Sequence, residues 1–179
     1  MIGQAGQPDQ EAIPYRGAQP LFISSDLVHL DVLQQWTKDD DLWVPQSDKV
    51  SFKPLILNCS AGYFVTLLRV RGAGVLSRHR HAGPVHAIVL KGRWRYLEHD
   101  WIAEEGSYAF EPAGETHTLV VPDEVSEMIT WFHVTGGYTY VDPDGRAVGY
   151  EDVFTKAELA RCHYEAIGLG ADYIQRVVR

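Results

Sequence analysis

Short runs of β-forming residues, each closed by a turn, fill the middle of the chain and constrain its fold most. Between residues 42 and 140 the runs are FKPLIL, YFVTLLRV, HAIVL, RWRYLEH, SYAFEP, HTLVVP, MITWFHV and YTYVD. They recur at a spacing of about ten residues, and glycine, proline or acidic turns separate them. No helical pattern lies between them. The arrangement predicts an all-β fold, an antiparallel sandwich or barrel.

The segment before this region predicts an arm and a short helix. Residues 1–20 carry three prolines and no periodic apolar pattern, which indicates an irregular arm. In SSDLVHLDVLQQW, a serine or aspartate precedes an apolar face made of Leu27, Leu30 and Leu33. We expect residues 1–41 to form the N-terminal arm and this short helix, and residues 42–150 to form the barrel.

The last part of the sequence predicts a C-terminal helical segment over residues 151–179. Thr155 and Glu158 have the spacing of a capping box, so a helix is expected to begin there. Gly168 and Gly170 interrupt this pattern, and ADYIQRVVR predicts one more turn or helix.

Charge and composition disfavour two classes of partner. The net charge is −8 and the isoelectric point is about 5.4, which argues against nucleic acid or an anionic membrane as the main partner. The N-terminus lacks the features of a signal peptide, and no apolar stretch approaches the roughly 18 residues of a membrane helix.

Cys59 and Cys162 are expected to be two buried free thiols, although one bridge between them would be possible. These features predict a cytoplasmic protein.

Four of the eight histidines lie in RHRHAGPVHAIVLKGRWRYLEHDW, residues 78–101. His79 and His81 are two residues apart, so on a strand both imidazoles point to the same face. A third imidazole, His117, is expected from a strand across the barrel, aimed inward by the turn at Pro112 and Gly114. Three such nitrogens form a facial set that suits a divalent transition metal.

Two segments resemble the paired motifs of the cupin superfamily, small jelly-roll barrels that hold a metal. The first cupin motif, G-x5-H-x-H-x(3,4)-E-x6-G, matches at His79, His81 and Gly92, with its opening glycine one residue too close. The second, G-x5-P-x-G-x2-H-x3-N, matches from Gly106 to His117, with valine at the final position. The resemblance implies a cupin jelly-roll barrel and a metal site made of these three histidines.

The glutamate position of the first motif is occupied here by Val85 or His86, neither of which has a carboxylate. A carboxylate ligand for the metal would therefore have to come from another residue. A three-residue hairpin loop after Leu90 would place Glu98 opposite His86, whereas a two-residue loop would turn Glu98 away. Glu98 shares its face with Trp94 and Tyr96, and burying these aromatics turns it inward. We therefore predict Glu98 as the fourth metal ligand in preference to a salt bridge with an arginine. His86 then lies close by, as an alternative ligand or a hydrogen-bonding group.

Several aromatic side chains are candidates for a substrate cage, although barrel cores also use such residues. The candidates are Trp94, Tyr96, Tyr108 and Phe110. His133 is expected in the core and His99 at the surface or an interface.

Within the cupins, the same segments are similar to the 2,4'-dihydroxyacetophenone dioxygenases and their ChrR-like relatives. This resemblance implies a non-haem Fe(II) dioxygenase of aromatic compound catabolism. Such an enzyme would use O2 to cleave an aryl hydroxyketone between its carbonyl and hydroxymethyl carbons, giving an aromatic carboxylic acid and formate. His86 would act as the catalytic base or orient a peroxide.

Two other functions stay open. One is a non-catalytic, ChrR-like cupin that binds Zn(II) and senses or partners another protein, although no Cys/His-rich segment precedes Leu42. The other is a metal-dependent isomerase or lyase. The resemblance also implies a homodimer or homotetramer formed through edge strands and terminal arms.

Overall fold

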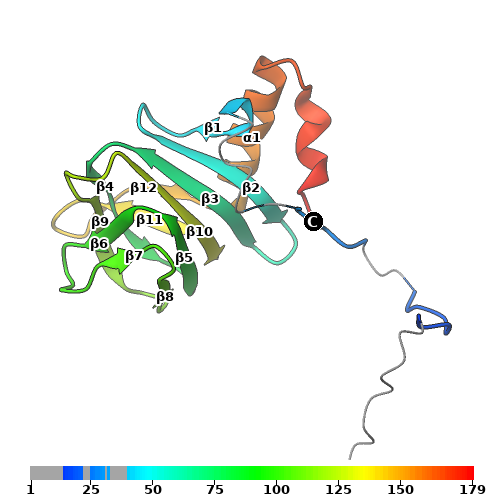
Figure 1. Cartoon of the computed structure of the whole chain (residues 1–179), viewed down its shortest axis with the longest axis horizontal. Helices are drawn as coiled ribbons and strands as arrows, with labels where there is room; N and C mark the ends of the chain where they lie inside the picture. The colour runs from blue at the N-terminus through cyan, green and yellow to red at the C-terminus, as the bar shows by residue number, and fades with distance from the viewer. Residues whose placement is uncertain (1–13, 22–24, 31, 33–39) are drawn as a thin grey trace, which may run out of the picture.

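A computed structural model describes residues 14–21, 25–30, 32 and 40–179. In this part of the chain, two six-stranded sheets face each other and a helical segment packs beside them (Figure 1). Every described strand pair is antiparallel, which confirms the predicted all-β architecture.

The first sheet contains six of the strands in the order β1-β2-β3-β10-β5-β8. Their bounds are β1 Val44–Pro45, β2 Val50–Asn58, β3 Tyr63–Arg71, β10 Glu127–Thr135, β5 Val85–Lys91 and β8 Tyr108–Glu111. The second sheet has the order β12-β11-β4-β9-β6-β7. Its strands are β12 Ala147–Glu151, β11 Tyr138–Val141, β4 Gly74–His81, β9 Thr116–Val121, β6 Arg93–Tyr96 and β7 Ala103–Glu104.

The core lies between the sheets and is rich in aromatic side chains. Trp94, Tyr96 and Phe52 are almost fully buried there, together with Phe64 and Leu57. Alternation along each strand places these side chains on the inner face, while their neighbours in sequence point outward.

The chain passes from one sheet to the other at Gly92. β5 and β6 therefore belong to different sheets, and the predicted hairpin between them is wrong. Gly92 has a φ of 71°, and a Cβ added there would lie 2.6 Å from the Glu127 carbonyl oxygen. Only glycine tolerates both conditions, so Gly92 fixes this crossing.

The C-terminal segment contains a helix, α1 (Val153–Ala166), and a 3-10 helix, η3 (Ala171–Arg176). Asp152 caps α1, because its carboxylate accepts hydrogen bonds from the backbone N–H groups of Phe154 and Thr155 at 2.9 and 2.8 Å. The Asp152 N–H in turn donates to Thr155 Oγ1 at 2.9 Å. The capping box is thus Asp152–Thr155, three residues earlier than the predicted Thr155–Glu158.

The region before β1 differs from the sequence prediction. Residues 25–30 form no helix, and Leu33 of the predicted helix lies outside the described residues, as do most of residues 1–20. A short 3-10 helix, η2 (Asp40–Leu42), leads into the first strand. No described helix is long and apolar enough to span a bilayer. Cys59 and Cys162 are both free thiols, but Cys59 is only half-buried and Cys162 is exposed, contrary to the prediction of two buried thiols.

Candidate metal centre

Three imidazoles meet inside the sandwich, as predicted. His79 and His81 come from β4, and His117 comes from β9. Each offers one ring nitrogen, and these atoms all lie within 4.8 Å of one another. His117 pairs directly with His79 in the β4–β9 ladder, so the third histidine comes from the neighbouring strand and not from across the barrel. All three side chains are buried.

The electrostatics of this cluster suit a cation. Burial, followed by the charge of His81, lowers the pKa of His79 to about 3, and burial lowers that of His117 to about 2. Both rings are therefore neutral at physiological pH and available as ligands. His79 Nε2 lies 3.0 Å from His81 Nε2, and His117 has no hydrogen-bond partner at either ring nitrogen. A divalent cation would satisfy these converging nitrogens.

The carboxylate beside the histidines belongs to Glu111, which the sequence reasoning missed. Its Oε2 lies 3.1 Å from His81 Nε2 and 3.6 Å from His117 Nε2, and its side chain is buried. Glu111 ends β8, directly before the Pro112 of the second motif. That position, six residues before His117, is the one signal in the sequence that could have found it.

Tyr96 holds Glu111 in place. Its hydroxyl donates a hydrogen bond of 2.7 Å to Glu111 Oε1. Its ring stacks on His117, with 3.6 Å between centroids and 8° between planes. Tyr96 was predicted to bind substrate, and the structure shows it lining the cavity while it supports two members of the cluster.

Glu98 is not part of this cluster, which corrects the predicted fourth ligand. Its carboxylate is exposed and accepts hydrogen bonds from Thr118 N and Thr118 Oγ1, at 2.7 and 2.8 Å. The physical reason is that β6 ends at Tyr96, so strand alternation no longer fixes where Glu98 points.

His86, Tyr108 and Phe110 lie on the outer face of the first sheet, contrary to their predicted catalytic and substrate-binding roles. His86 Nδ1 is 2.7 Å from the Tyr108 hydroxyl. Tyr108 and Phe110 are 61% and 55% exposed. The inner positions of β8 are taken by Ala109 and Glu111, so alternation along the strand turns Tyr108 and Phe110 away from the cavity. Trp94 is fully buried in the core and is not among the residues that line the cavity.

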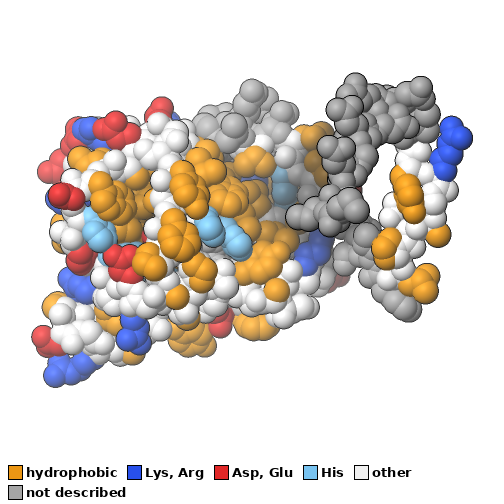
Figure 2. All heavy atoms as spheres, turned by 90° about the horizontal axis from the view of Figure 1, so that it is seen from below, with side chains coloured by type: hydrophobic (Ala, Val, Ile, Leu, Met, Phe, Trp, Pro, Cys, Tyr) orange, Lys and Arg blue, Asp and Glu red, His pale blue; other side chains and the backbone are white. Residues whose placement is uncertain are grey.

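These outward residues belong to a larger group, which we call the outer aromatic patch. It consists of Tyr63, His86, Ile88, Tyr108, Phe110, Trp131 and His133. Figure 2 shows a face of the molecule on which hydrophobic side chains gather around histidines. His133 was expected in the core, but its ring stacks on His86 within this patch.

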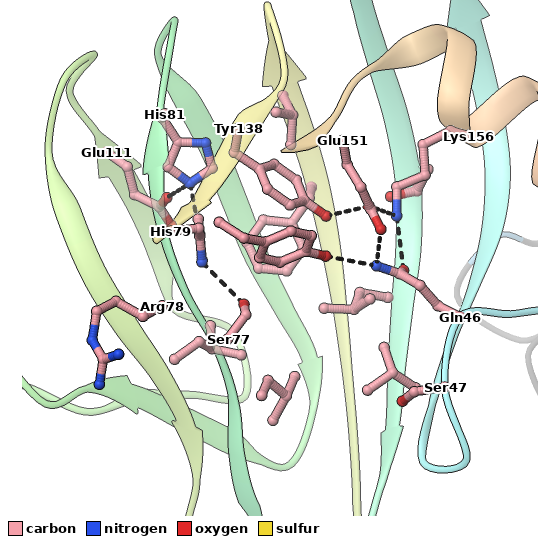
Figure 3. Close-up of a pocket in the computed structure, with 18 of the residues that line it drawn as sticks. Gln46, Ser47, Ser77, Arg78, His79, His81, Glu111, Tyr138, Glu151 and Lys156 are labelled. Carbon is pink, nitrogen blue, oxygen red and sulfur yellow. Dashed lines mark hydrogen bonds and ion pairs between the residues drawn. The ribbon is translucent and has the colours of Figure 1, made fainter. Parts of the chain in front are cut away.

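A cavity of about 540 Å³ opens beside the histidines. His79, His81 and Glu111 lie at one side of it, and aromatic and aliphatic side chains such as Phe64, Leu119 and Phe132 form walls. Figure 3 shows Tyr138 between the histidines and a second polar group, which contains Gln46, Glu151 and Lys156. The site thus combines a buried histidine cluster that could hold a cation with a mostly apolar cavity large enough for a small ligand.

Comparison with known families decides where the chain belongs. A model of the ChrR cupin-like domain matches residues 34–138, more than half of the sequence. The chain belongs to the ChrR cupin-like family. This confirms the cupin resemblance drawn from the two histidine motifs. No curated protein matches the chain.

Solved structures support the family and the fold. An RmlC-like cupin protein from Ralstonia eutropha JMP134 is 30% identical in sequence to this chain, and the two structures superpose with a TM-score of 0.67. The match covers 69% of this chain and 82% of the other protein. An acetylacetone dioxygenase from Acinetobacter johnsonii is 16% identical, with a TM-score of 0.66. That match covers 84% of this chain and 99% of the dioxygenase. The second likeness shows the shared fold alone.

Proposed function

We propose that the protein is a non-haem Fe(II) dioxygenase that cleaves an aryl hydroxyketone between its carbonyl and hydroxymethyl carbons. The reaction converts ArC(O)CH2OH and O2 into ArCOOH and HCOOH, so each product gains one atom of O2. The observation that carries the proposal is the buried cluster of three imidazoles with the Glu111 carboxylate beside them. The similarity of both histidine motifs to the dihydroxyacetophenone dioxygenases supports this substrate class, and the acetylacetone dioxygenase shows that the fold hosts dioxygenase chemistry on a ketone.

The residues present fit an iron ion. His79, His81 and His117 would hold it, and Glu111 Oε2 would be a fourth ligand that contributes one negative charge. When bound, Fe(II) supplies Lewis acidity toward the ketone and electrons for the reaction with O2.

The remaining residues orient the ligands and exclude water. Ser77 Oγ lies 3.0 Å from His79 Nδ1 and can fix the orientation of that ring. Tyr96 fixes both Glu111 and the plane of His117 through its hydrogen bond and its stacked ring. The apolar walls of the cavity would hold the substrate ring and keep water away.

An oxygen electrode tests the proposal. Protein loaded anaerobically with Fe(II) should consume one O2 for each 2,4'-dihydroxyacetophenone and release formate and 4-hydroxybenzoate. A His79→Ala variant should fold but lose both the metal and the activity. Absence of O2 uptake with this compound and with related hydroxyketones would reject the proposal.

The alternative is a non-catalytic zinc-binding sensor or partner of another protein, the role that the resemblance to ChrR-like cupins implies. Elemental analysis of freshly purified protein separates the two functions. Tightly bound zinc without O2 consumption would support the sensor, or an isomerase or lyase on the same scaffold, whereas iron with O2 consumption would support the dioxygenase.

A further inference from the structure

The cavity contains a second polar site, built from four separate parts of the chain. Gln46 follows β1, Tyr138 and Tyr140 come from β11, Glu151 ends β12, and Lys156 lies in the first turns of α1. All five residues line the same cavity as His79 and His81. We call Gln46, Tyr140, Glu151 and Lys156 the distal cluster.

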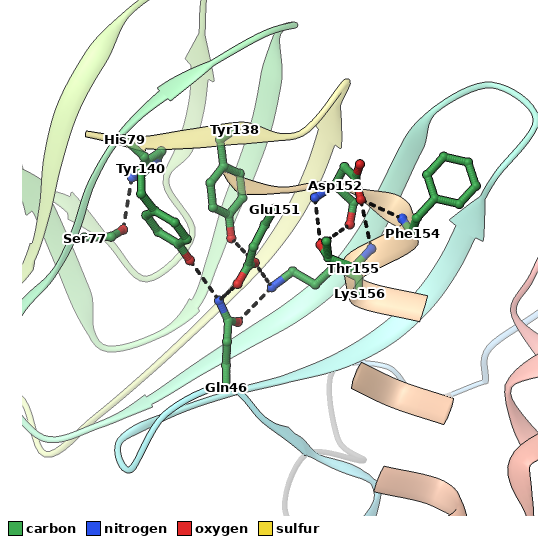
Figure 4. Close-up of polar contacts among 10 residues, drawn as sticks. All are labelled: Gln46, Ser77, His79, Tyr138, Tyr140, Glu151, Asp152, Phe154, Thr155 and Lys156. Atoms are coloured by element: carbon green, nitrogen blue, oxygen red, sulfur yellow. Dashed lines mark hydrogen bonds and ion pairs between the residues drawn. The ribbon is translucent and has the colours of Figure 1, made fainter. Parts of the chain in front are cut away.

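Hydrogen bonds fix the distal cluster in one arrangement (Figure 4). Lys156 Nζ lies 2.5 Å from Glu151 Oε2 and donates to Gln46 Oε1 at 2.8 Å. Gln46 Nε2 donates to Glu151 Oε1 at 2.6 Å and to the Tyr140 hydroxyl at 3.2 Å. Lys156 is only 2% exposed, so its ammonium group is held in the protein interior at considerable desolvation cost.

The Tyr138 side chain lies between the distal cluster and the three histidines and contacts both. Its ring centroid lies 5.0 Å from that of His79 and 5.5 Å from that of His81. Its hydroxyl donates to Glu151 Oε2 at 2.6 Å. One para-hydroxyphenyl group therefore spans the distance from the histidines to the distal cluster. A substrate ring lying alongside Tyr138 would reach the same polar groups with its own para substituent.

The charge of the distal cluster restricts what that substituent can be. Lys156 and Glu151 carry opposite charges, and each is already paired with the other. A carboxylate brought into this buried site would leave a net negative charge, whereas a neutral hydroxyl would not. The Tyr140 hydroxyl lines the cavity and accepts from Gln46, and burial raises its pKa to about 12, so it stays protonated and can donate to a ligand oxygen that competes for its proton.

We propose that the distal cluster recognises a hydroxyl group para to the reacting side chain of the substrate, with Tyr140 as the residue that contacts it. This inference rests on the proposed function for the position of the reacting end. It makes Tyr140 a specificity-determining residue, because a ligand without the para hydroxyl forms no hydrogen bond with the Tyr140 hydroxyl.

A binding experiment tests the inference without requiring turnover. The affinities of 4'-hydroxyacetophenone, acetophenone and 4-acetylbenzoate are measured by calorimetry on the full-length, metal-loaded protein without O2. We expect the para-hydroxylated ligand to bind about 3- to 10-fold more tightly than acetophenone, as one hydrogen bond allows, and more tightly than the carboxylate. Tyr140→Phe should abolish the preference, whereas the matched control Tyr108→Phe, on the outer face, should keep it.

Equal affinities in the native protein, no measurable binding of the phenol, or a preference that survives Tyr140→Phe would each overturn the inference. The oxygen-electrode assay reports separately on the proposed function. A protein that prefers the phenol but consumes no O2 would reject the dioxygenase and keep the distal cluster as a binding site.

Discussion

The Tyr96 hydroxyl donates a 2.7 Å hydrogen bond to Glu111 Oε1, and the other oxygen of that carboxylate lies 3.1 Å from His81 Nε2. One oxygen is thus fixed by a buried phenol while the other faces His81 and His117. Burial and the Glu111 charge raise the Tyr96 pKa well above its usual value, so the phenol stays a hydrogen-bond donor.

Glu111→Gln should weaken metal binding, because the site loses the negative charge closest to the imidazoles. We expect the affinity to fall by about 10- to 100-fold in a chelator competition assay. The matched control is Glu98→Gln, whose carboxylate is exposed and bound to Thr118. A loss of affinity in the Glu98 variant with none in the Glu111 variant would contradict our assignment.

His86→Ala should leave metal content and turnover unchanged, because His86 lies on the outer face of the first sheet against Tyr108. His117→Ala, on the inner face, should abolish metal binding. Elemental analysis and the oxygen electrode together check this pair. If His86→Ala lost turnover but kept the metal, His86 would have a catalytic role and this prediction would be wrong.

Lys156→Met should destabilise the protein, because the buried Glu151 carboxylate loses its counter-charge. We expect a loss of about 3 to 5 kcal/mol in the free energy of unfolding by urea. The control Lys91→Met breaks the more exposed pair with Glu127 and should cost at most about 1 kcal/mol. Adding Glu151→Gln to Lys156→Met should recover part of the loss, and equal effects of the two lysine variants would refute this account.

Alkaline pH should destabilise the protein through Tyr140. Burial raises its folded pKa from 10 to about 12, so the folded state binds the proton more tightly than the unfolded state. The resulting stability is complete below pH 10 and is lost as the pH rises to 12. Between these values, native stability should fall by about 2 to 3 kcal/mol more than that of Tyr140→Phe, measured by urea unfolding. Parallel stability curves for the two proteins would contradict the prediction.

We expect a second copy of the chain to cover the outer aromatic patch. None of the seven residues of this patch carries a carboxylate, ammonium or guanidinium group, so two copies could meet there without placing like charges against each other. Phe110→Glu should therefore shift the protein from dimer to monomer in sedimentation velocity. Val148→Glu, at an exposed valine of β12, is the matched control and should remain dimeric. A native protein that sediments as a monomer would disprove this interface.

The sequence alone determined the β-rich architecture and the three histidines. Alternation within a strand is a local property, so the spacing of His79 and His81 was enough to place both on one face. The turn residues before His117 identified the third imidazole in the same local way.

Only the tertiary structure decided which carboxylate and which aromatics face the site. Glu98 was assigned by extending strand alternation past Tyr96, where β6 ends, and by a hairpin that the crossing at Gly92 replaces. Tyr108 and Phe110 look like core residues, yet the ladder of β5 with β8 turns them outward and brings Glu111 in. The distal cluster joins residues up to 110 positions apart, and no local pattern encodes a contact at that separation. Local periodicity determines which side chains share one face of a strand. Where strands end, where the chain crosses between sheets and which strands pair determine what that face contacts.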